Sequence, residues 1–145
     1  MKVNQLSVFV ENQPGRLAGV ARALGENDIN IMAMTIAETK EFGVLRMIVA
    51  DYEKGMQVLK DAGYTVVTTE ILAIEVQDKP GALARVLEAF AGKNLNVEYM
   101  YAFVARRGDA AILVFRFDDP DRAVDALKDS EVRVLTNEEV ISLEK

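Results

Sequence analysis

Asn12-Gln13-Pro14-Gly15-Arg16-Leu17 is the stretch that decides the fold, because it recurs as Asp78-Lys79-Pro80-Gly81-Ala82-Leu83. Each copy follows a short apolar run and precedes a segment in which apolar residues recur at helical spacing. A turn from a strand into a helix leaves backbone N–H groups without partners at the helix start, which favours a small anion. The two copies therefore predict a repeated strand–turn–helix unit with a candidate binding site at each turn.

Outward from the first turn, the pattern predicts strand, helix, strand, strand, helix, strand. Pro14 suits the first position of the first helix, because its ring presets a helical φ. Polar residues 38–42 form the turn between the second and third strands, and Gly63 caps the second helix. We expect strands at 6–10, 29–37, 44–50 and 64–68 and helices at 14–26 and 53–62.

The second turn opens the same order of elements. We expect strands at 71–76, 95–104, 110–117 and 132–135 and helices at 80–90 and 119–127. The two copies define domains 1–69 and 70–145, and Thr68-Thr69-Glu70 is the whole join between them. This join has no glycine or proline, so the units are held side by side and not on a flexible linker. Thr136 and Glu139 resemble a capping box in a short extension that packs on the second unit.

Composition excludes several classes of function. The 145 residues contain no cysteine and no histidine, which removes disulfides, thiolate chemistry and the commonest general base. The net charge of −6 does not favour nucleic acid, which binds basic surfaces. No apolar run has the roughly 20 residues of a membrane span, and no secretory signal opens the chain, so we expect a cytoplasmic protein without membrane contact. No catalytic residue, metal site or cofactor is indicated.

The turns supply the groups that a free amino acid needs. The N–H groups of Gly15, Arg16 and Leu17 are donors for a carboxylate, and Asn12 or Asp78 is an acceptor for an ammonium group. Structure alone also explains Pro-Gly and the asparagines, because both are common in turns. The recurrence of all these features together favours binding. The candidate ligand-binding residues are Asn12, Pro14, Gly15, Arg16, Leu17, Asn30 and Ile31 in the first copy, and Asp78, Pro80, Gly81, Ala82, Leu83, Asn96 and Val97 in the second.

Each copy resembles the ACT domain in the order of its motifs. A strand is followed by Asn/Asp-x-Pro-Gly-x-Leu and a helix, and then by Asn-Ile-Asn-Ile or Asn-Leu-Asn-Val, which leads into the next strand. The resemblance covers nearly the whole chain twice. It implies an α+β fold of two ferredoxin-like βαββαβ units, each with an antiparallel four-stranded sheet and both helices on one face, joined side by side. It also implies ligand binding between units, near the Pro-Gly turns.

Two readings of function remain open. The first is a non-catalytic regulatory protein that senses a free amino acid. The second is an assembly subunit that uses the ACT-like fold without a small-molecule ligand. Both imply a homodimer or higher homo-oligomer through sheet edges, with a metabolic enzyme as a further candidate partner. An enzyme fits worst, because Lys40, Lys79 and Lys93 all lie in polar turns that would not desolvate an amine.

Overall fold

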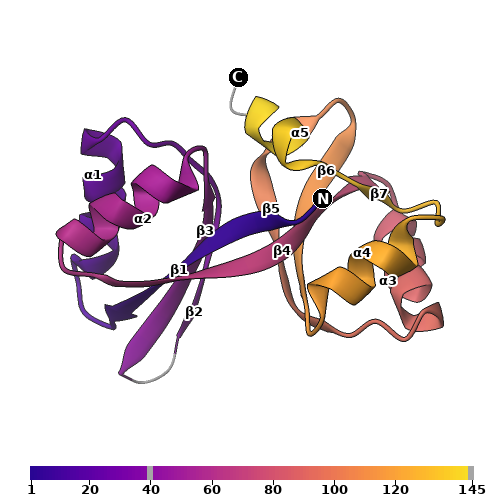
Figure 1. Cartoon of the computed structure of the whole chain (residues 1–145), viewed down its shortest axis with the longest axis horizontal. Coiled ribbons are helices and arrows are strands. Elements are labelled where there is room, and N and C mark those ends of the chain that lie inside the picture. The colour runs from indigo at the N-terminus through magenta and orange to yellow at the C-terminus, as the bar shows by residue number, and fades with distance from the viewer. Residues whose placement is uncertain (39–40, 144–145) are drawn as a thin grey trace. The chain divides into compact units, whose positions relative to one another are not determined.

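The computed structural model describes residues 1–38 and 41–143, which form two compact units (Figure 1). One unit is Asn4–Thr69, and the other combines Met1–Val3 with the chain from Glu70 onward. Within this second unit, the Lys2 Nζ lies 3.2 Å from a Glu70 carboxylate oxygen and 2.6 Å from one of Asp121. Within the described residues, no helix has the length and apolar character that crossing a membrane requires.

The first unit has the predicted order of elements. It contains β1 (Val3–Glu11), α1 (Arg16–Glu26), β2 (Ile31–Glu38), β3 (Phe42–Val49), α2 (Tyr52–Asp61) and the beginning of β4 (Thr65–Gln77). β3 pairs antiparallel with both β1 and β2, and β4 pairs with β1. Both helices cover one face, since Val20, Leu24 and Leu59 share a buried core with residues of β1 and β3.

The second unit repeats this arrangement. It contains the rest of β4, α3 (Ala82–Gly92), β5 (Val97–Arg107), β6 (Ala110–Phe117), α4 (Pro120–Leu127), β7 (Arg133–Val134) and α5 (Asn137–Ser142), with strand order β5-β6-β4-β7. Its described strand pairs are antiparallel. Phe90 of α3 anchors the core, edge-on to Phe115 and Phe117 with ring centroids 5.1 Å apart in each case.

The α+β class with βαββαβ units and the capping box at Thr136 are confirmed, whereas the helix starts and the last strand differ from the predictions. Pro14 and Pro80 precede the helices, which begin at Arg16 and Ala82 after a glycine N-cap. The strand expected at 132–135 is only Arg133–Val134. The expected extension is a helix with a complete capping box between Thr136 and Glu139. The predicted turn at 38–42 includes residues 39–40, which lie outside the described residues.

A single strand, β4, replaces the two strands expected at 64–68 and 71–76. No turn residue interrupts it, because Thr68, Thr69 and Glu70 all tolerate an extended backbone. The fourth strand of the first copy and the first strand of the second are thus one continuous strand.

Candidate ligand-binding site

The two Pro-Gly turns have the same backbone geometry. Gly15 has φ 88° and ψ −14°, and Gly81 has φ 86° and ψ −14°. This left-handed conformation favours glycine, because a side chain would be strained there. A Cβ built on either glycine would meet nothing within 4 Å. Both glycines are therefore required by backbone shape, and both also face open space.

Hydrogen bonds within the turns correct the predicted set of donors. The Arg16 amide donates to the Gln13 carbonyl at 3.3 Å, and the Ala82 amide donates to the Lys79 carbonyl at 3.2 Å. The Arg16 amide is therefore not the spare donor that the sequence predicted, and the corresponding Ala82 amide is not free either. Among the described residues, no acceptor is found for the amides of Gly15, Leu17, Gly81 and Leu83. Donors thus remain at each turn on both sides of the amide that the turn itself uses.

The charges at each turn already have partners. Arg16 lies 3.7 Å from Glu11, and Asp78 lies 2.5 Å from Arg106. All four side chains are at least half exposed, so these pairs are weak and open to exchange. Asp78 can accept an ammonium group from a ligand only in competition with Arg106.

The structure does not bring Asn30, Ile31, Asn96 or Val97 to the turn of their own unit. Along β3, Phe42 pairs with Glu11 beside the first turn, whereas Val49 pairs with Ile31. Seven residues of antiparallel strand separate those two rows, which is about 24 Å. In the second unit, Ala110 pairs with Gln77 beside the turn and Phe117 pairs with Val97, again seven residues away. Within one unit, the predicted residues of the turn and the predicted residues of the second strand therefore lie at opposite ends of the sheet.

Two cavities flank the second turn. One of about 680 Å³ lies between α3 and the residues around β7, with Val76, Ala82, Val86, Ala89 and Val132 as apolar lining. Its polar lining comes from Glu75, Gln77, Arg85, Glu131 and Arg133. It opens where β4 continues past the short β7, so the edge of β4 at residues 76–77 faces it. The second, of about 430 Å³, is lined by Glu75, Gln77, Asp78, Lys79, Arg107, Asp109 and Ala110.

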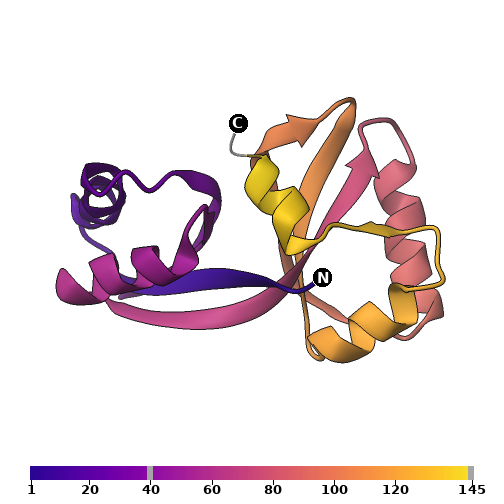
Figure 2. The same ribbon diagram turned by 45° about the horizontal axis from the view of Figure 1, so that its top comes forward.

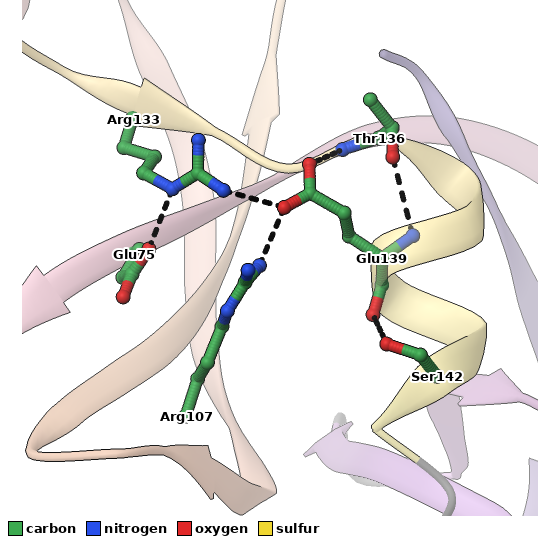
Figure 3. A network of polar contacts seen from close by, with 6 residues as sticks. All are labelled: Glu75, Arg107, Arg133, Thr136, Glu139 and Ser142. Carbon is green, nitrogen blue, oxygen red and sulfur yellow. Dashed lines mark hydrogen bonds and ion pairs between the residues drawn. The ribbon is translucent and has the colours of Figure 1, made fainter.

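Sequence reasoning missed a polar network beside the smaller cavity (Figure 3). Glu139 Oε2 accepts hydrogen bonds from Arg107 Nη1 and Arg133 Nη2, both at 2.5 Å. Its Oε1 accepts from the Thr136 amide at 3.0 Å, and Arg133 Nε donates to Glu75 at 2.9 Å. The capping box was the only sequence signal for this network, because the three other members come from different strands.

The same network sets the charge state of Glu139. The hydrogen bond from Arg107, followed by that from the Thr136 backbone, lowers the pKa of Glu139 from 4.5 to about 2. The hydrogen bond to Glu139 in turn raises the pKa of Arg107. Glu139 therefore stays ionised down to about pH 2 in the folded protein.

Comparisons with known proteins agree with the fold. A family model described as ACT domain pair matches residues 1–144. Protein BT0572 from Bacteroides thetaiotaomicron has a similar crystal structure, with 37% sequence identity, a TM-score of 0.90, and coverage of 97% of this chain and 96% of that chain. The ligand-free regulatory subunit of aspartate kinase from Thermus thermophilus shares the fold at 17% identity and a TM-score of 0.62, covering 86% and 90% of the two chains. A search of curated proteins finds no match.

Proposed function

Because the chain belongs to the ACT domain pair family, whose domains are regulatory and bind ligands, we propose that it is a non-catalytic sensor of a free α-amino acid. The ligand carboxylate binds at the Pro-Gly turns, and its ammonium group binds the acceptor side chain that opens each turn, Asn12 or Asp78. The regulated partner is a second protein, with a metabolic enzyme as the class that fits an amino-acid signal.

The repeated turn geometry is the observation that carries this proposal. Both turns leave amides on either side of the helix start without an acceptor among the described residues, and both face open space at a glycine. These amides belong to the first turn of a helix, where the helix dipole favours a negative group. A carboxylate can approach the backbone at Gly15 or Gly81 because no side chain stands in front of it.

A complete site needs two units. The turn and the strand start that holds Asn30 or Asn96 lie at opposite ends of one sheet. We therefore propose that the turn of one unit and the Asn-x-strand start of another contact one ligand, either within the chain or across a homodimer formed through sheet edges. This arrangement gives the duplication a function, because a single unit supplies only half of the contacts.

The direct test is calorimetry with each of the twenty amino acids. A ligand of about nine heavy atoms at roughly 0.6 kcal/mol per atom gives a Kd near 0.1 mM. Saturation at about 100 times this Kd would stabilise the fold by about 2.7 kcal/mol, which a thermal melt detects easily. The absence of both heat and thermal shift with every amino acid would contradict the proposal.

Paired variants locate the carboxylate. Gly15→Asp and Gly15→Asn strain the left-handed backbone similarly, but only the first adds a negative charge at the turn. We expect Gly15→Asp to abolish binding at that turn and Gly15→Asn to weaken it less; Gly81 offers the same pair. Gly63→Asp is the control for backbone strain, since Gly63 has φ +93° and open space but belongs to neither Pro-Gly turn. Equal binding in the Asp and Asn variants at both turns would place the carboxylate elsewhere.

Exposed apolar side chains on the first unit favour a second candidate, an assembly subunit without a small-molecule ligand. Phe9, Met34 and Ile36 are between 40% and 48% exposed. Such residues suit a protein interface when they are grouped. This candidate predicts a protein partner whose retention in a pull-down does not change with any added amino acid. Release of the partner by an amino acid would instead support the sensor.

A further inference from the structure

Helix α5 lies on the face of the second-unit sheet opposite α3 and α4 (Figure 2). The alternation along β4 explains this position, since Ile74 points into the helix-covered core and Glu75 points to the other face. Arg133 is the strand partner of Glu75, and Arg107 follows on β5 beside the same end of the sheet. The strands thus present two guanidinium groups and one carboxylate on the face where α5 lies.

The attachment of α5 to this face is light. Val140 is the only one of its six residues that is buried, with 1% of its surface exposed. The polar attachment runs through the single carboxylate of Glu139. A helix of this length is not stable without packing, so these two side chains decide whether it stays on the sheet.

The groups around Glu139 match a free amino acid. Two guanidinium groups converge on one carboxylate oxygen, which is a strong arrangement for holding an anion. The Arg133 guanidinium donates hydrogen bonds to both Glu75 and Glu139, so two carboxylates share this one cation. Glu75 and Arg107 also line the 430 Å³ cavity, so a small molecule in it can reach an acceptor and a donor together.

We propose that Arg107, Arg133 and Glu75 form a second amino-acid site, which the chain itself occupies with the Glu139 carboxylate. A free α-amino acid would place its carboxylate on the two arginines and its ammonium group against Glu75. Its ammonium group relieves the repulsion between the Glu75 and Glu139 carboxylates, which Arg107 and Arg133 offset when Glu139 is bound. Entry of the ligand displaces Glu139 and releases α5 from the sheet, so ligand binding alters the face that α5 covers.

The groups that hold the carboxylate at this site differ from those of the Pro-Gly turns, although Asp78 and Lys79 of the second turn also line the 430 Å³ cavity. The donors at this site are guanidinium groups on β5 and β7, whereas the turns offer backbone amides at the starts of α1 and α3. Gly81→Asp separates the two, because it blocks the second turn and leaves the arginines in place. Failure of the turn proposal therefore does not decide this one.

The test follows the guanidinium NMR signals of Arg107 and Arg133 in the full chain during titration with L-alanine and with acetate. Glu139→Gln removes the competing charge but keeps the capping box, in which glutamine also serves. We expect L-alanine to shift both arginine signals in this variant with an affinity about tenfold or more above the wild type, because the tethered competitor is removed. Acetate, which lacks the ammonium group, is expected to bind more weakly. The matched control is Glu138→Gln, an exposed neighbour on the same helix.

A second pair of variants tests the release of α5. Val140→Ala weakens the apolar anchor and leaves Glu139 intact, and Ile141→Ala changes a side chain that is 43% exposed. We expect Val140→Ala to bind L-alanine more tightly than the wild type, and Ile141→Ala to bind it as the wild type does. The proposal is overturned if Glu139→Gln folds but L-alanine leaves both arginine signals in place. It is also overturned if wild type and Glu139→Gln bind L-alanine equally, if acetate binds as well as L-alanine, or if Gly81→Asp abolishes the shifts.

Discussion

Protonation of Glu139 is expected to destabilise the second unit at low pH. The pKa of this carboxyl is about 2 in the folded protein, against a usual value of 4.5. Taken in full, this difference corresponds to about 3 kcal/mol of stability at neutral pH. Arg107 and Arg133 are 40% and 52% exposed, so solvent screens the interaction. We therefore expect a contribution of about 1 kcal/mol.

The sign of the effect follows from the direction of the shift. A carboxyl whose folded pKa is depressed stabilises the protein above its unfolded pKa and loses this contribution as pH falls through the folded value. Glu139 therefore contributes fully above about pH 5, and its contribution declines between about pH 5 and pH 2. The Glu139→Gln variant lacks this titrating group and cannot show that part of the decline.

Urea unfolding of wild type and Glu139→Gln between pH 7 and pH 2.5 measures this difference. Methyl signals of Val134 and Val140 assign the transition to the second unit, because the two units need not unfold together. The wild type should be more stable by about 1 kcal/mol at pH 7, with the gap closing as pH falls. A gap that stays constant or widens toward low pH would refute the reasoning, and Glu138→Gln should show no such pH-dependent gap.

Three further changes test the packing. Phe90→Ala should destabilise the second unit by about 3–5 kcal/mol in urea melts, because it removes a ring packed on Phe115 and Phe117. Gly25→Ala should stabilise the first unit by about 0.5–1 kcal/mol, since the new methyl meets nothing within 4 Å in a helix. Gly55→Ala should bring no such gain in the same measurement, because its Cβ would lie 3.1 Å from Val49 and 3.3 Å from Leu6. A stabilised Gly55→Ala or a neutral Phe90→Ala would contradict the described cores.

Much of the fold follows from local patterns in the sequence. Apolar spacing at Leu17, Val20 and Leu24 predicts a helix, and both Val20 and Leu24 are buried in the structure. Repetition then gives the order of elements in the second copy without further information. The helix starts were misplaced at Pro14 and Pro80, because a glycine in the left-handed region follows each proline and delays the helix.

The candidate site was less accessible to sequence reasoning. The Arg16 N–H was assigned to a ligand, but the tight turn before the helix uses it, as the second turn uses the N–H of Ala82. Asn30 and Asn96 were grouped with the turns because they recur with them, whereas strand register puts them at the other end of the sheet. The Glu139 network was missed because its arginines come from strands that only tertiary structure brings together.

The two turns are more alike than their sequences indicate. The first turn has Arg16 and Asn12 where the second has Ala82 and Asp78. These differences in charge suggest that the first turn attracts a carboxylate better. In the structure, Glu11 offsets the charge of Arg16 and Arg106 offsets that of Asp78, so the net charge beside each turn is similar. Because these exposed pairs contribute at most about 1 kcal/mol, they change the relative affinity of the turns by about fivefold at most. The backbone conformations of Gly15 and Gly81 agree within 2° in φ, with the same ψ of −14°. A large preference for one turn would therefore have to come from the strand start that completes the site. Replacing Asn30 and Asn96 by alanine, one at a time, would show which of the two strand starts is responsible.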